Sequence, residues 1–142
     1  MTDRPLFYLL DEQGNPVPAK DEDHAQVDAL LGNFDARRVG LTKKVIAGRH
    51  VMVSTIFLCS DEQYLLTLSE DVPIELFQTC VFVNKITTGL EKYYKTREEA
   101  IQGHEDVCRD VDFLGHDVER GRGKLGWLGR NLEKLQGLRE IV

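Results

Sequence analysis

The chain has 142 residues, of which 42% are hydrophobic and 30% charged, and its formal net charge is −6. This length fits one domain that buries about two-thirds of its unfolded surface. The negative charge argues against a general nucleic-acid binder, which needs a basic face for phosphate contacts. No apolar run approaches the roughly 20 residues that span a bilayer. The N-terminus lacks the apolar region of a signal peptide, so we expect a protein of the cell interior.

The three cysteines, Cys59, Cys80 and Cys108, are widely spaced and form no C-x-x-C pair. This spacing indicates neither a zinc knuckle nor a redox dithiol, and we predict no cofactor and no metal. Free, mostly buried thiols in a reducing compartment are the simplest interpretation.

Residues 6–34 predict a short strand, a turn and a helix. Residues 6–10 are apolar, and Gly14-Asn15-Pro16 should reverse the chain. Acidic residues after Ala19 suit a helix N-terminus. The apolar residues that follow fit one side of a helix: Ala25, Val27, Leu30, Leu31 and Phe34.

Residues 39–94 predict strands joined by short connections. The strands are 39–46, 51–59 and 74–84, with a short one at 90–94, and the turns are at 47–49 and 87–89. Residues 61–73 read as a polar loop. Side chains of strand 51–59 alternate between two faces, and both faces are largely apolar, which favours a central position in the sheet. Short connections between consecutive strands indicate an antiparallel meander.

A helix is predicted to begin after Thr96, which forms a capping box with Glu99. Its apolar residues recur at helical spacing: Ala100, Ile101, His104, Val107, Cys108 and Val111. His104 therefore falls in the middle of the buried side. Gly103 beside it indicates a close approach of the helix backbone to the sheet.

Residues 115–142 differ in composition, with six glycines and a net charge of +2, which leaves −8 for the residues before them. They read as a basic linker followed by an amphipathic helix bearing Leu128, Leu132, Leu135 and either Leu138 or Val142. We therefore predict an α+β core domain at 1–114, with an antiparallel sheet of four or five strands covered by two helices, and a separate C-terminal segment at 115–142.

Several blocks together resemble a known family. The segments "YLLDEQGNPVP", "RRVGLTKKV", "HVMVSTIFL", "ELFQTCVFV" and "YYKTREEAIQGHEDV" resemble, in order and spacing over about residues 7–111, small uncharacterised proteins of tailed bacteriophages and prophages. The last block matches the family at Thr96, Glu98, Glu99, Ala100, Gly103 and His104. The resemblance implies a phage origin, a location in the host cytoplasm and a shared fold, and it brings no assigned activity.

Two positions depart from the family pattern. Asp61 stands at the family's aspartate, but Glu62 replaces a histidine and Gln78 replaces a glutamate. A two-histidine site of the family would therefore be incomplete in this chain.

His104 is the main candidate for chemistry. It could act as a general base held by Asp61 or Glu75, or bind a metal with Cys108 one helical turn away. The simpler interpretation is a partly buried imidazole that bonds a backbone carbonyl or a strand hydroxyl such as Ser54 or Thr55. Neither hydroxyl lies in a nucleophile motif, and acidic neighbours would raise the pKa of Cys59 and weaken it as a nucleophile.

Two surfaces are candidates for partner binding. One is the acidic loop with Asp61, Glu62, Glu70 and Asp71, whose spacing matches no EF-hand. The other is the C-terminal segment, where Trp127 lies off the leucine side and the basic residues are Arg120, Arg122, Lys124 and Arg130. That segment could also mediate self-association.

The sequence favours a small phage-encoded, non-enzymatic accessory protein that binds a host or phage protein, and the class suggests inhibition of host defence or host machinery. Two alternatives stay open. One is a small hydrolase, metal-dependent or built on His104 and Asp61. The other is a virion or assembly component that self-associates through its C-terminal helix.

Overall fold

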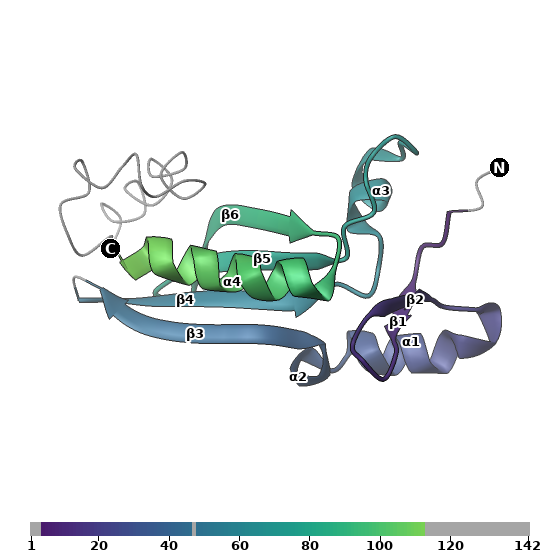
Figure 1. The fold of residues 1–142 in the computed structure, drawn as a ribbon, viewed down its shortest axis with the longest axis horizontal. Coiled ribbons are helices and arrows are strands. Elements are labelled where there is room, and N and C mark those ends of the chain that lie inside the picture. Colours follow the sequence, from purple (N-terminus) through teal and green to yellow (C-terminus); the bar gives the residue numbers. More distant parts are fainter. Residues whose placement is uncertain (1–3, 47, 113–142) are drawn as a thin grey trace.

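The computed structural model describes residues 4–46 and 48–112, and it confirms the α+β class (Figure 1). The large sheet has the strand order β3-β4-β5-β6, with every neighbouring pair antiparallel. Its strands are β3 (Arg38–Ile46), β4 (Arg49–Phe57), β5 (Phe77–Val83) and β6 (Ile86–Tyr94). Helix α4 (Arg97–Asp112) lies along one face of this sheet, as the meander and the capping box predict.

Smaller elements gather beyond one end of the large sheet (Figure 1). A two-stranded sheet pairs β1 (Tyr8–Leu10) with β2 (Pro16–Pro18). The short helices are η1 (Asp21–Asp23), α1 (His24–Leu31), α2 (Phe34–Arg37) and α3 (Glu62–Thr67). No helix within residues 4–46 and 48–112 is long and apolar enough to cross a membrane.

The core lies between α4 and the large sheet. Alternation along β4 and β5 turns Val53, Thr55 and Phe57 to the same side as their register partners Val81, Thr79 and Phe77. Valines of this side form one apolar cluster with Val107 and Val111 of α4. Burial of these side chains supplies the main attraction between helix and sheet.

Helix α4 begins as its capping residues predict. The Glu99 backbone N–H donates to Thr96 Oγ1 at 3.1 Å, and Glu99 Oε2 accepts from the Lys95 N–H at 3.2 Å. The Thr96 bond satisfies one N–H of the first helical turn. Glu99 accepts from Lys95 rather than from Thr96, so only half of the predicted capping box forms.

Glycine allows α4 to lie close to the sheet. A Cβ built at Gly103 would lie 2.0 Å from Cε1 of the Tyr94 ring, far closer than van der Waals contact allows. Tyr94 comes from β6 and is buried, so its ring has little room to withdraw. The close backbone approach expected at Gly103 is therefore present.

The first helix differs from its prediction. The chain between 20 and 37 divides into η1, α1 and α2, and within this stretch only Val27 of the predicted apolar side is buried. Val27 packs in a cluster with Tyr8, Phe57 and Phe77, so α1 closes the end of the core rather than a face of the large sheet. Phe34 is exposed, because α2 begins there and turns it away.

The predicted turn at 87–89 is wrong. The chain reverses at Asn84 and Lys85, which have φ of 49° and 69°, and β6 runs through 87–89. Positive φ at both central residues suits a tight hairpin, and asparagine tolerates it better than most residues. Gly89, with φ of 77°, lies where the β5–β6 register shifts, so it serves a bulge rather than a turn.

The predicted loop 61–73 contains the helix α3. Asp61 caps it by accepting the Tyr64 N–H at 3.3 Å, and Leu68 ends it in the left-handed conformation, φ 56°. The boundary predicted at 114, the linker and the helix at 127–142 lie outside the described residues.

Replacement of Gly103 by alanine should destabilise the fold by about 1–3 kcal/mol, because the new methyl overlaps the Tyr94 ring. The matched control is Gly32→Ala at the end of α1, where a Cβ has its nearest atom at 3.6 Å. That variant should stay within about 0.5 kcal/mol of the wild type. Urea unfolding measures the stability of both variants. An unchanged unfolding midpoint for Gly103→Ala would mean that the Tyr94 ring can move aside for the new methyl group.

Candidate functional site

His104 joins α4 to the sheet by hydrogen bonds at both ring nitrogens. Nδ1 bonds Thr55 Oγ1 of β4 at 2.7 Å, and Nε2 bonds Thr42 Oγ1 of β3 at 2.9 Å. Thr55 also bonds Thr79 of β5. The hydrogen bond to Thr55 that the sequence suggested is therefore present, and three strands share one network with the helix.

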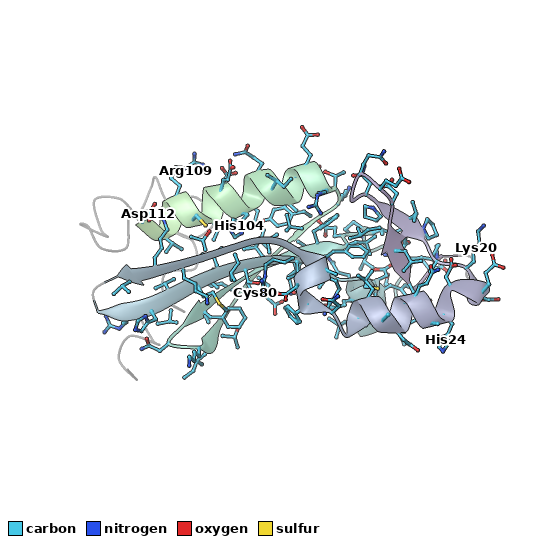
Figure 2. All side chains as sticks on the ribbon, turned by 90° about the horizontal axis from the view of Figure 1, so that it is seen from below. Lys20, His24, Cys80, His104, Arg109 and Asp112 are labelled. Atoms are coloured by element: carbon cyan, nitrogen blue, oxygen red, sulfur yellow. The ribbon has the colours of Figure 1, made fainter. Side chains whose placement is uncertain are left out.

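The imidazole is enclosed as well as bonded. It is 8% exposed, and a Cβ built at Gly40 would lie 2.9 Å from the ring, so glycine makes room for it on β3. Figure 2 shows His104 between α4 and the sheet. Burial lowers the pKa of His104 below its usual value, which favours the neutral ring. A neutral imidazole has one donor and one acceptor, and a threonine hydroxyl can take either role, so both ring nitrogens can be satisfied.

Asp61 belongs to a second buried group, at the end of the sheet. The Nε–H of Arg4 donates to Asp61 Oδ2 at 2.6 Å, and the Asp61 side chain is fully buried. Arg4 Nη1 also donates to the carbonyl of Val72 at 2.7 Å. The Arg4 guanidinium thus binds the N-terminal segment to both ends of residues 61–72.

His104 and Asp61 have separate partners. The histidine bonds threonines of the sheet, and the aspartate bonds Arg4 and caps α3. Glu75 accepts from Gln63 instead of from the histidine. Within residues 4–46 and 48–112 no group of three or more His, Cys, Asp or Glu side chains could hold a metal ion. The arrangement of these residues is that of two structural anchors.

Two of the candidate nucleophiles, Thr55 and Cys59, have no exposed surface. Thr55 is fully buried, while Ser54 points to the opposite side of β4. Burial raises the pKa of Cys59, and it raises the pKa of Cys80 to about 11. Both thiols are therefore protonated at neutral pH and weak as nucleophiles.

The acidic loop divides into buried and exposed parts. Asp61 is buried, and burial raises the pKa of Glu62, with Glu91 adding to the shift. Glu70 and Asp71 are exposed. The predicted partner-binding residues Trp127, Arg120, Arg122, Lys124 and Arg130 lie outside the described residues.

The connection between β4 and β5 also exposes apolar side chains, which the sequence analysis did not predict. We call the set formed by Leu65, Leu66, Leu68 and Ile74 the leucine patch. Leu66 is 78% exposed and Leu68 is 73% exposed. The segment "DEQYLLTLSEDVPI" contains a signal for helix α3, because Asp61 stands three residues before Tyr64, at the spacing of a helix N-cap.

Comparisons of the chain with models of protein families, with curated proteins and with solved structures return no match. The functional argument therefore rests on this chain's own surfaces.

Stability should depend on the protonation of His104. Its pKa is lowered by folding, so the unfolded chain binds the proton more readily, and stability should fall as pH drops below about 6.5. His104→Gln should lose about 1–3 kcal/mol at neutral pH, with a smaller change between pH 7.5 and 5.5. His24→Gln, whose histidine side chain is 82% exposed, should keep the wild-type dependence. Equal pH dependence in the wild type and His104→Gln would contradict this role.

Removal of Arg4 should be costly because it leaves a buried carboxylate unpaired. Arg4→Met should destabilise by about 3–5 kcal/mol, and the double variant Arg4→Met/Asp61→Asn by less than the sum of the single changes. The control is Arg109→Met, which removes the exposed pair with Asp106 and should cost less than about 1 kcal/mol. Thermal unfolding of the four variants measures the coupling, and strict additivity would contradict it.

Proposed function

We propose that this chain is a small non-enzymatic accessory protein that acts by binding another protein, and that the leucine patch is its contact surface. The observation that carries the proposal is a group of exposed aliphatic side chains on a firmly anchored projection. In Figure 1, α3 and its following loop extend away from the layers formed by α4 and the large sheet.

Exposure of this patch is costly for a soluble protein. Scattered apolar side chains are common on surfaces, but neighbouring ones on one projection are typical of contact sites. Leu65 and Leu66 lie on α3, Leu68 ends it, and Ile74 follows on the same connection. Full burial of one such aliphatic side chain against a partner contributes roughly 1.5–3 kcal/mol.

The base of the projection is rigid. Asp61 caps α3, the Leu68 N–H closes it on the Tyr64 carbonyl at 2.6 Å, and Arg4 lies over the Tyr64 ring at 5.2 Å. A leucine with φ of 56° is uncommon, because its Cβ crowds the backbone. A shape that is fixed before binding loses less entropy when the partner arrives.

The surroundings of the patch suggest the chemistry of the partner. Of the acidic surface expected from the sequence, Glu70 and Asp71 are exposed, on the same connection as the leucines, whereas Asp61 is buried. A matching partner has an apolar groove with basic residues at its rim, since charges at the rim guide association. The phage resemblance suggests a host defence or host machinery component as that partner.

The test is recovery of a partner from bacterial host lysate on tagged protein, followed by an affinity measurement. Wild type should retain one partner in stoichiometric amount, and Leu66→Glu/Leu68→Glu should weaken binding by about 30-fold or more. Both leucines are exposed, so the fold should be unchanged by circular dichroism.

The control is Ile101→Glu, which adds the same charge at a 45% exposed residue of α4 and should bind like the wild type. No stoichiometric partner for the wild type would count against the proposal. Equal binding by the leucine variant would show that another surface makes the contact.

A further inference from the structure

The large sheet carries a hollow of about 400 Å³ at the end where the chain turns from β3 into β4. This end lies away from α1, α2 and α3, and therefore away from the leucine patch (Figure 1). Its volume falls within the range of small-molecule sites, which is about 300–1,000 Å³. We call it the hairpin hollow.

The hairpin hollow combines basic and apolar side chains on one face of the sheet. The face opposite α4 carries the four lining side chains that alternate with core residues: Lys43, Val45, His50 and Met52. Register places Val45 beside His50, and Lys43 beside Met52. Lys43 and His50 are therefore diagonal neighbours across two strands, with the apolar groups of Val45 and Met52 between them.

Among the described residues that line the hairpin hollow, every charged one is a lysine, although the chain has a net charge of −6. These lysines are Lys43, Lys44 and Lys85. Lys44 forms an ion pair with Asp112 of α4. In the part of the chain that the structure describes, Lys43 and Lys85 form no ion pair. Two such ammonium groups and the His50 imidazole favour a ligand that brings negative charge.

Lys85 occupies a backbone position that favours glycine. It is the second residue of the two-residue turn between β5 and β6, and its φ is 69°. Such a turn prefers glycine there, because a Cβ at positive φ crowds the backbone. The turn is tied to β4, since the His50 N–H donates to Asn84 Oδ1 at 3.0 Å and the Asn84 N–H donates to the His50 carbonyl at 2.8 Å. The chain therefore keeps a lysine at a strained position and holds it beside His50.

We propose that the hairpin hollow binds a small phosphate monoester that carries an apolar or aromatic group. The phosphate accepts from Lys43, Lys85 and His50, and the apolar group lies over Val45 and Met52. A phosphate monoester has close to two negative charges at neutral pH and three terminal oxygens, which match two ammonium groups and one imidazole. A carboxylate has one charge and two oxygens, so it would leave one of these groups without an acceptor. The aliphatic stems of the lysines add apolar surface for the ester group.

The test is calorimetric titration of the full chain with phenyl phosphate at pH 7.5 and low salt. We expect a dissociation constant below about 1 mM. Inorganic phosphate and phenol should each bind at least about fivefold more weakly, since each offers only one part of the ligand. Equal affinity for inorganic phosphate would show that the apolar groups contribute nothing and would overturn the assignment to an ester. Adenosine monophosphate, titrated in parallel, separates nucleotides from smaller esters by its affinity relative to phenyl phosphate.

Charge reversal locates the ligand. Lys43→Glu and Lys85→Glu should each weaken phenyl phosphate binding by at least about tenfold, because a carboxylate then faces the phosphate. One control is Lys95→Glu, the same change at an exposed residue after β6, at the opposite end of the sheet. The other is Arg120→Glu/Arg122→Glu in the basic C-terminal segment. Both controls should bind like the wild type. Loss of binding in the C-terminal variant alone would place the phosphate on that segment, and the proposal would be wrong.

Lys85→Gly separates binding from stability. Glycine accepts the positive φ without crowding, so the urea midpoint of this variant should rise above that of the wild type. Its affinity for phenyl phosphate should nevertheless fall by at least about fivefold. A lysine with a purely structural role would not show this combination. Wild-type affinity in Lys85→Gly, or no binding of phenyl phosphate by the wild type, would overturn the proposal.

Discussion

The hydrogen bonds of His104 fix the position of helix α4 on the large sheet. Apolar burial attracts α4 to the sheet but does not fix its position, because valine contacts allow sliding and rotation. The imidazole reaches Thr55 on one strand and Thr42 on the next, and Thr55 reaches Thr79. A helix bound at both nitrogens of one ring can neither turn nor shift without leaving buried polar groups unpaired.

Glycine completes this constraint at two points. Gly40 leaves space for the imidazole on β3, and Gly103 leaves space for the Tyr94 ring on α4. Larger side chains at either position would lift the helix and lengthen the threonine hydrogen bonds. The hydrogen-bonding groups of His104 are therefore used to fix the position of α4 on the sheet.

One surface that α4 leaves free is the leucine patch. It lies on the connection held by the Arg4–Asp61 pair, and α3 lies beyond the end of the sheet (Figure 1).

The order of strands, the antiparallel meander and the start of α4 can be predicted from the sequence, because alternation, helical spacing and the Thr96 cap are local signals. The sequence also placed His104 on the buried side of its helix, with a strand hydroxyl as partner. It did not place the β5–β6 turn, because Asn84 and Lys85 adopt positive φ only once the strands pair. The folded chain alone shows that Arg4 pairs with Asp61, that α1 closes the end of the core, and that the leucines of α3 are exposed. These features join residues far apart in the chain, and no local pattern specifies which distant groups will meet.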